Sequence, residues 1–342
     1  MLKKKLALVL AMAMAASLAL SGCGNPHASS SGSGSGSGSG GTSAAAPSGG
    51  SGETAVLATG GSTGTYYGVG SGMCTVLNPI IGDVLNMTAT STGASKENVQ
   101  GITDDKYQLA ILQSDVLTYA HNGQDMFEEP ETDALWVAGL YNETVQITAR
   151  GGITDVSELA GKTVCVGDRG SGTEFNARQV LEAYGMTTAD ITATNGSFGD
   201  AANDLKDGKI DAAFVVAGAP TVAITTLATA KDTYLVGLDD EHIAKLQESS
   251  PYYEEYIIPE GTYEGVPETK TVAVVATVIA RDDVSEEDVY NICYTIFENM
   301  DNLAHDKAGE LDVEFASGVT AVPYHAGAAK YFAEKGFDVP TK

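Results

Sequence analysis

Strand-length apolar runs alternate with helical patterns from residue 53 almost to the end of the chain. Four runs predict strands in a first series, at residues 55–58, 85–89, 108–112 and 135–140. Three amphipathic patterns between them predict helices, at residues 65–81, 95–103 and 115–122. This alternation is typical of βαβ units and predicts an α/β fold with a mostly parallel sheet flanked by helices.

A second series of the same kind begins at residue 163 and predicts a second lobe. Its predicted strands lie at residues 163–166, 191–194, 210–216 and 234–238. Its predicted helices lie at residues 173–184 and 199–206, and a third would have Pro220 in its first turn. The chain then adds a strand at 271–280 and helices at 285–305 and 324–335, the first opened by the capping signature "SEED".

Gly, Ser and Thr fill the first strand-to-helix turn of each series. The first turn reads "TGGSTGTYY", and the second, at residues 167–175, reads "GDRGSGTEF". Free backbone N–H groups and the helix dipole favour an anion at such a helix start. Ligands of open α/β sheets bind at the same edge. Two lobes that face each other would therefore grip one small anion between these turns.

The first turn also fits a hydrolase pattern, because residues 60–64 spell G-x-S-x-G and make Ser62 a candidate nucleophile. An Asp and then His325 follow downstream, so a secreted serine esterase is an alternative. However, Ser62 follows the first strand of the body. No earlier loop can supply the second oxyanion-hole N–H of that fold. We therefore expect a binding protein and no enzyme.

Residue spacing gives no support for a metal centre or a cofactor. Cys74, Cys165 and Cys293 lack C-x-x-C spacing, and whether Cys74 pairs with Cys293 is left open. No two histidines stand four residues apart, and no Lys follows the glycines as a P-loop requires. Removal of residues 1–22 takes away three lysines and no acid, so the formal net charge changes from −26 to −29. Such an acidic body is not expected to bind nucleic acid.

The first 52 residues predict export and attachment to the cell membrane. Residues 1–22 combine three lysines, a short apolar run and small residues, as a secretory signal does. Residues 20–23 resemble a lipobox, which makes Cys23 the expected site of lipidation. Residues 23–52 are mostly Gly, Ser, Ala and Thr and predict a flexible tether. The expected location is extracytoplasmic and lipid-anchored.

Five blocks of the sequence resemble the TAXI family of solute-binding proteins, the extracytoplasmic receptors of TRAP transporters. In order they are "ATGGSTGTYYGVG", "LAILQSDVLTYAHNG", "VCVGDRGSGTEFNARQVLEAYGM", "FGDAANDLKDGKIDAAFVVAGAP" and "VPYHAGAAKYFAEKGF". The resemblance implies a type II periplasmic-binding-protein clamshell. Lobe 1 would be residues 53–145 with 271–342, and lobe 2 would be residues 146–270.

The resemblance also implies a ligand and a partner. The ligand would be a small carboxylate such as glutamate, glutamine or a 2-oxoglutarate-like dicarboxylate. The partner would be a TRAP membrane permease driven by an ion gradient. A receptor for an ABC importer or for a sensor kinase is the alternative within the same structural class.

Matching the blocks position by position implies these ligand contacts: Gly61, Ser62, Thr63, Thr65, Tyr66, Gln113, Ser114, Ser171, Gly172, Thr173, Gly218 and Ala219. Arg169 departs from the family, where a small residue or proline commonly precedes "GSGT". A guanidinium there could bind a second carboxylate, which favours a dicarboxylate ligand. A surface salt bridge is the alternative role for Arg169.

Overall fold

The computed structural model describes residues 47–299 and 302–342. The predicted signal peptide at 1–22 and the expected lipidation site Cys23 lie outside these residues, as does most of the predicted tether at 23–52. Residues at the end of the predicted tether contact the folded body: the Ser51 N–H donates to Asp288 Oδ1 (3.2 Å) and the Gly52 N–H to the Val84 carbonyl (2.7 Å). Among the described residues, no helix has the length and apolar character needed to cross a membrane.

One mixed sheet of ten strands runs through the described part of the chain. The strands are β1 Glu53–Ala58, β2 Leu85–Thr90, β3 Leu109–Gln113, β4 Ala134–Ala149, β5 Thr163–Cys165, β6 Thr192–Thr194, β7 Ala212–Ala217, β8 Tyr234–Leu235, β9 Glu254–Ile258 and β10 Thr269–Arg281. Their order is β2-β1-β3-β10-β4-β7-β5-β6, with β8 paired to β4 and β9 paired to β10. Pairing is parallel within β2-β1-β3 and within β7-β5-β6.

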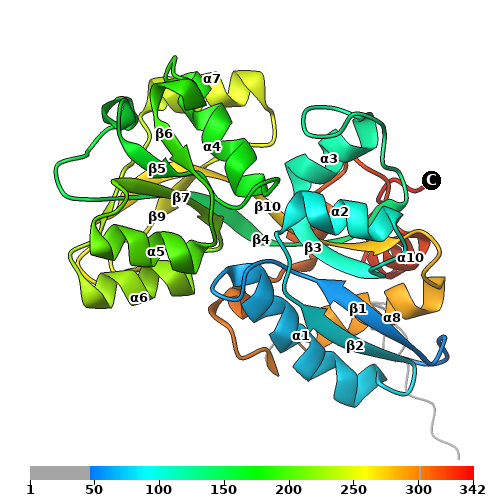
Figure 1. The fold of residues 1–342 in the computed structure, drawn as a ribbon. Helices are drawn as coiled ribbons and strands as arrows, with labels where there is room; N and C mark the ends of the chain where they lie inside the picture. Colours follow the sequence, from blue (N-terminus) through cyan, green and yellow to red (C-terminus); the bar gives the residue numbers. More distant parts are fainter. Residues whose placement is uncertain (1–46, 300–301) are drawn as a thin grey trace, which may run out of the picture. The chain divides into compact units, whose positions relative to one another are not determined.

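The two long strands β4 and β10 join these parallel groups and are antiparallel to each other (Figure 1). One part of β10 pairs with β3 and the other part pairs with β9. Residues 144–149 of β4 pair with β7. The β4–β10 register shifts between Ala276 and Thr277 and between Val278 and Ile279. The middle of the sheet is therefore antiparallel and irregular, whereas both sides are parallel.

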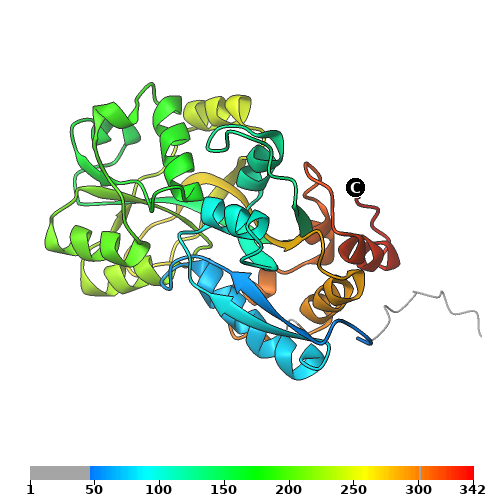
Figure 2. The same cartoon turned by 45° about the vertical axis from the view of Figure 1, so that its right-hand side comes forward.

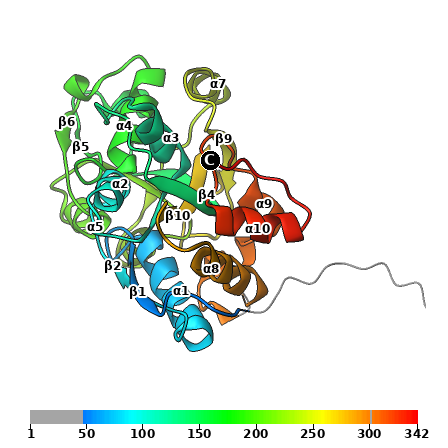
Figure 3. The same ribbon diagram turned by 90° about the vertical axis from the view of Figure 1, so that its right-hand side faces the viewer.

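Helices flank the sheet on both sides of this middle. They are α1 Thr65–Ile81, α2 Ser95–Thr103, α3 Ser114–Asn122, α4 Gly172–Ala183, α5 Phe198–Asp207, α6 Val222–Ala230, α7 Asp240–Ser249, α8 Glu286–Glu298, α9 Val313–Ser317 and α10 Ala326–Glu334, with short 3₁₀ turns at Val156–Leu159, Thr188–Asp190 and Asp306–Glu310. Helix α1 packs on β2 and α8 (Figure 2), and α10 packs on α8 (Figure 3). Helix α4 packs on β7 and α7, and α5 packs on α6.

Two large hydrophobic cores lie in the body. The first core draws on residues 55–141 and 276–332, and the second core draws on residues 145–274. We call the parts around them the first half and the second half. The chain passes between the two cores twice, once inside β4 and once inside β10.

The predicted α/β fold is confirmed, and several details of the prediction are wrong. The sheet is mixed because β4 and β10 run antiparallel. Strand β4 continues past residue 140 to Ala149, and the helix expected at 285–305 ends at Glu298. Pro220 does not start a helix: its peptide bond with Ala219 is cis, and α6 begins at Val222 after the N-cap residue Thr221. Helix α7 and strand β9 were not predicted.

Candidate ligand-binding site

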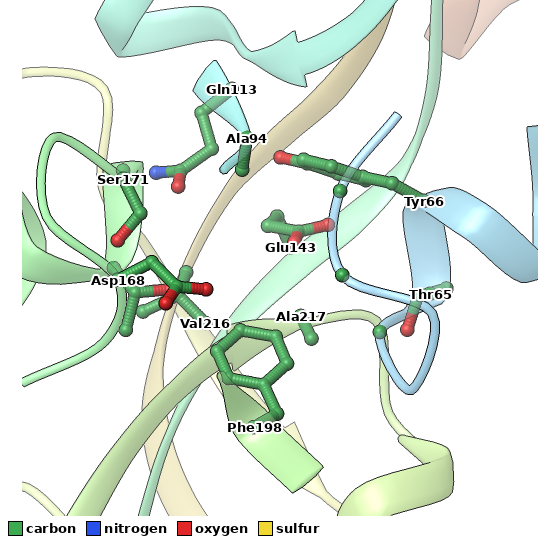
Figure 4. A pocket seen from close by; sticks show the side chains of 15 residues that line it. Thr65, Tyr66, Ala94, Gln113, Glu143, Asp168, Ser171, Phe198, Val216 and Ala217 are labelled. Carbon is green, nitrogen blue, oxygen red and sulfur yellow. The ribbon is translucent and has the colours of Figure 1, made fainter. Parts of the chain in front are cut away.

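Both glycine-rich turns line one pocket between the first half and the second half (Figure 4). The space between atoms in and around the pocket, including the part open to solvent, is about 460 Å³, and about 30 Å³ of it is free for the centre of a water molecule. Its lining comes from the first turn, from β3, from the middle of β4, and from the second turn with the start of α5 and the end of β7. The lining residues are Gly60, Gly61, Gly64, Thr65, Tyr66, Ala94, Gln113, Glu143, Asp168, Ser171, Gly172, Thr173, Phe198, Val216 and Ala217.

The first turn closes tightly and leaves the start of α1 without a side-chain cap. The Gly64 N–H donates to the Gly61 carbonyl (2.9 Å). Gly64 is the N-cap residue of α1, and no side chain accepts from the first N–H groups of the helix. These N–H groups are therefore available to a ligand. The Thr65 hydroxyl donates to the Gly218 carbonyl (2.8 Å), which ties this turn to the second half.

The second turn is capped by its own serine. Ser171 Oγ accepts from the Glu174 N–H (3.1 Å) at the start of α4. Gly167 holds a positive φ of +93°, which favours glycine. A Cβ at Gly172 would stand 1.7 Å from Gln113 Oε1, so this position accepts no side chain while Gln113 keeps its place. The turn and Gln113 therefore fit together across the pocket.

Glu143 is a buried carboxyl group in the pocket wall. It lies in the middle of β4 and is 2% exposed. Its Oε2 has no hydrogen-bond partner among the described residues, and the same is true of the Tyr66 hydroxyl, which also faces the pocket. Burial raises the pKa of Glu143 well above its usual range, and the charge of Lys307 opposes this rise. An unpaired buried carboxyl group is costly unless a ligand partners it.

A second carboxyl group, Asp168, faces the same pocket from the second turn. It is partly buried, and burial together with nearby Asp200 raises its pKa. The lining contains no Lys and no Arg. Lys307 is buried outside it, where its ammonium group pairs with Glu310 and lies 5.8 Å from the Tyr141 ring centroid. The pocket thus offers two acids to a ligand and no side-chain cation.

Asp115 lies at the start of α3 and accepts a hydrogen bond from Gln113, a residue of the pocket lining. It is fully buried, and burial raises its pKa to about 6 although four side-chain and backbone hydrogen bonds oppose the rise. The titratable groups whose charges act with it are Tyr66 from α1, Glu143 from β4, Tyr119 from its own helix and Tyr253 before β9.

The high pKa of Asp115 gives a testable pH dependence of stability. A folded-state pKa near 6, above the unfolded value near 3.9, means that the native state binds more protons between these pH values. The buried charge therefore costs up to about 3 kcal/mol above pH 6, and this cost vanishes as the pH falls toward 4. We expect the unfolding free energy of the wild type, measured by urea titration relative to Asp115→Asn, to rise by about 1.4 kcal/mol between pH 7.5 and pH 5. A constant difference would contradict the shifted pKa.

The structure brings one group of the predicted contact residues to this pocket and leaves a second group outside it. Those that line the pocket are Gly61, Thr65, Tyr66, Gln113, Ser171, Gly172 and Thr173. Those outside it are Ser62, Thr63, Ser114, Arg169, Gly218 and Ala219. Ser62 is exposed, and Ser114 is buried with its hydroxyl accepting from the Val275 N–H (3.3 Å). The Gly218 carbonyl serves Thr65 instead of a ligand.

Arg169 points to a different place from the one expected. It lines a separate, exposed groove together with Lys96 and Arg178. Its guanidinium forms no ion pair with any residue that the structure describes. The prediction of a second carboxylate bound by Arg169 in the pocket therefore has no geometric support.

The esterase alternative also lacks its geometry. Within the described ranges, Ser62 has no hydrogen bond to a histidine or an acid. The ring of His325 accepts from the Gly327 N–H (3.2 Å) at the start of α10, where it lines another pocket. Cys74, Cys165 and Cys293 are free buried thiols. No cluster of metal-ligating side chains occurs among the residues searched, 47–299 and 302–342.

Glu143 and Asp168 are the functional candidates that the sequence prediction missed. Glu143 carried a signal, since it is the one acid within the apolar segment from Leu135 to Ala149. An acid inside a strand of buried residues is uncommon without a partner. Asp168 stood within the quoted second turn but was not singled out. Phe198, Val216 and Ala217 gave no signal beyond that of ordinary core residues.

Comparisons with known proteins match this chain to one family and to several solved structures. Residues 57–336 match the model of the NMT1-like family. A solved protein from Bordetella bronchiseptica RB50 aligns with a TM-score of 0.52 at 14% identity, covering 83% of this chain and 80% of that one. The alkanesulfonate-binding protein SsuA from Xanthomonas axonopodis pv. citri, bound to MOPS, aligns with a TM-score of 0.45 at 14% identity and 85% coverage of both chains. A binding protein component of an ABC phosphonate transporter from Pseudomonas aeruginosa aligns with a TM-score of 0.45 at 11% identity and 78% coverage of both.

Proposed function

The chain belongs to the NMT1-like family, and on that premise we propose that it is an extracytoplasmic solute receptor. It holds one small molecule between the two glycine turns and delivers it to an importer in the membrane. The pocket supports the proposal, because both halves contribute to it and a buried carboxyl group faces it unpaired. The proposed location rests on the predicted signal peptide and on the predicted lipidation of Cys23.

We propose residues 53–145 with 271–342 as lobe 1 and residues 146–270 as lobe 2. The separate hydrophobic cores support this division, because each half buries its own apolar side chains. The two crossings inside β4 and β10 allow the lobes to close around a ligand by bending. The register shifts at Ala276/Thr277 and Val278/Ile279 mark an irregular stretch where such bending would be least costly.

The pocket chemistry changes the ligand expected from the sequence. A dianion such as 2-oxoglutarate would face Glu143 and Asp168 without any lining cation. A zwitterion fits better, with its carboxylate at the uncapped start of α1 and its ammonium beside the two acids. We therefore propose a small amino acid, which keeps glutamate and glutamine as candidates and disfavours dicarboxylates without an amine.

We propose an ABC-type permease as the membrane partner, which is the alternative from the sequence. The TRAP class rested on the resemblance of five blocks alone, and the name of the matching family specifies neither type of transporter. The two partners differ in energy source. Uptake by vesicles that contain the receptor and its permease should require ATP for an ABC importer, and an ion gradient without ATP for a TRAP transporter.

A thermal-shift screen of the purified protein tests the proposed ligand class. At one hundred times its Kd, a ligand adds about 2.7 kcal/mol to the unfolding free energy, which raises the Tm by about 5 °C. We expect such a rise with at least one L-amino acid and none with 2-oxoglutarate or succinate. A rise with dicarboxylates alone would contradict the zwitterion. No rise with any amino acid or carboxylate would contradict the receptor.

A further inference from the structure

A buried chain of hydrogen bonds joins the two halves beside the pocket. Gln113 Nε2 donates to Asn176 Oδ1 (2.6 Å) and, at 3.3 Å, to Asp115 Oδ1. Asn176 Nδ2 donates to Asp115 Oδ2 (3.0 Å) and to the Tyr253 hydroxyl (2.6 Å). The Tyr253 hydroxyl in turn donates to Gln179 Oε1 (2.5 Å). Gln113 and Asp115 belong to the first half, whereas the other three residues belong to the second.

The direction of this chain is set by Asp115. An ionised carboxylate only accepts hydrogen bonds, so it requires N–H groups from both amide side chains that face it. Asn176 must therefore turn its nitrogen to Asp115, which leaves its oxygen for Gln113. Gln113 then uses both of its N–H groups on Asn176 and Asp115. Burial makes any reversed amide costly, because two donors or two acceptors would meet without water.

The free end of the chain is the carbonyl oxygen of Gln113. Figure 4 shows this oxygen turned toward the space that Glu143 and Ser171 also face. The missing Cβ of Gly172 makes room for it. Three acceptor groups from three segments thus line the pocket: the Gln113 oxygen, the Glu143 carboxyl and the Asp168 carboxyl.

We propose that Asp115, which does not line the pocket, is a positioning residue that makes the site specific for N–H donors by holding the Gln113 carbonyl toward the ligand. This inference rests on the proposed receptor function and adds to it the origin of the selectivity. An ammonium group has three donors and matches three acceptors. A keto group at the same place has none and would meet the Gln113 oxygen directly.

The proposal predicts that Asp115→Asn reverses the chain. The new N–H group would face Asn176 Nδ2, so donor would meet donor. The least costly relief turns over Asn176 and then Gln113, and the pocket receives the N–H group of Gln113 in place of its oxygen. Adding Asn176→Asp to Asp115→Asn moves the carboxylate one step along the chain. The carboxylate at position 176 would accept N–H groups from Gln113, so the Gln113 oxygen would face the pocket again as in the wild type.

Calorimetric titrations with L-glutamate and 2-oxoglutarate test this reversal, because the two probes share a skeleton and differ in ammonium against keto. In the wild type we expect L-glutamate to bind at least about tenfold more tightly. The ratio should fall by about tenfold or more in Asp115→Asn and recover in the double variant. A control, Asp288→Asn, changes another buried acid of the first half, far along the sequence, and should leave the ratio unchanged.

An equal loss of affinity for both probes in Asp115→Asn would overturn the proposal, as would a folded double variant that fails to recover. A ligand-free measurement separates this failure from failure of the receptor function. In protein labelled with ¹⁵N-glutamine, the Gln113 side-chain amide should exchange slowly with solvent in the wild type and faster in Asp115→Asn. The buried amide of Gln146, which donates to the Ala217 carbonyl, is an internal reference. If neither probe binds the wild type, the proposed ligand class is wrong. The orientation of Gln113 is tested separately, because an equal exchange rate of its amide in the wild type and in Asp115→Asn would refute it.

Discussion

Replacing Glu143 by glutamine is expected to weaken L-glutamate binding by about 100-fold. The substitution keeps the shape of the side chain and removes the negative charge that would face the ligand ammonium. A hydrogen bond to a charged group contributes about 1.5 to 3 kcal/mol, and the upper value applies to a site buried to 2% exposure. Titration calorimetry measures the Kd directly.

Ligand binding is also expected to release a proton. Burial holds the pKa of Glu143 well above its usual range in the empty pocket, so an arriving ammonium would drive a proton off the carboxyl group. The wild type should therefore bind more weakly as the pH falls, and its binding enthalpy should depend on the buffer. Both effects should be smaller in Glu143→Gln, where Asp168 is the remaining acid in the lining with a raised pKa. Glu248→Gln, a change at an exposed acid of α7, is the matched control. An unaltered Kd in Glu143→Gln would contradict the role of the carboxyl group.

Adding one methyl group at Gly327 is expected to destabilise the first half by about 3 kcal/mol. A Cβ at this position in α10 would stand 2.1 Å from the Glu286 carbonyl oxygen and 2.9 Å from the Tyr290 nitrogen of α8. Both are backbone atoms, so the helices would have to move apart. The Tm of Gly327→Ala should fall by about 6 °C or more.

The control for this clash is Gly309→Ala in the Asp306–Glu310 turn. A Cβ there meets nothing within 4 Å, so the Tm should stay within about 1 °C of the wild type. Differential scanning calorimetry measures both variants. A Tm for Gly327→Ala equal to that of the control would show that α8 and α10 are not packed as closely as described.

Periodicity predicted the strands and helices of the first half well because each one stands alone between turn residues. The same signal failed in β4. Asn142, Glu143 and Thr144 interrupt its apolar run, yet they remain paired with β10, and Thr144 also pairs with β7. Nothing local shows that a strand continues through polar residues when its partners lie more than seventy positions away. The antiparallel middle of the sheet depends on those distant pairings.

The candidate site also has one part that the sequence predicted and one part that it did not. Backbone turns at helix starts have a local sequence signature, so both glycine turns were found. The charge balance of the pocket has none, because Glu143 and Asp168 come together only when two separate series of elements meet. Arg169 was expected beside the ligand for its chemistry, but its neighbour Asp168 lines the pocket instead. A shift of one residue along a turn reverses the charge that a ligand meets.

The attachment of residues 51 and 52 to the first half has a mechanical consequence. Ser51 and Gly52 attach to Asp288 and Val84, both of the first half. A pull through the N-terminal segment would therefore load that half alone. If this segment is attached to a membrane, the first half would stay fixed. The second half would then move relative to it by bending of β4 and β10. An importer could then detect whether a ligand is bound from the position of the second half alone.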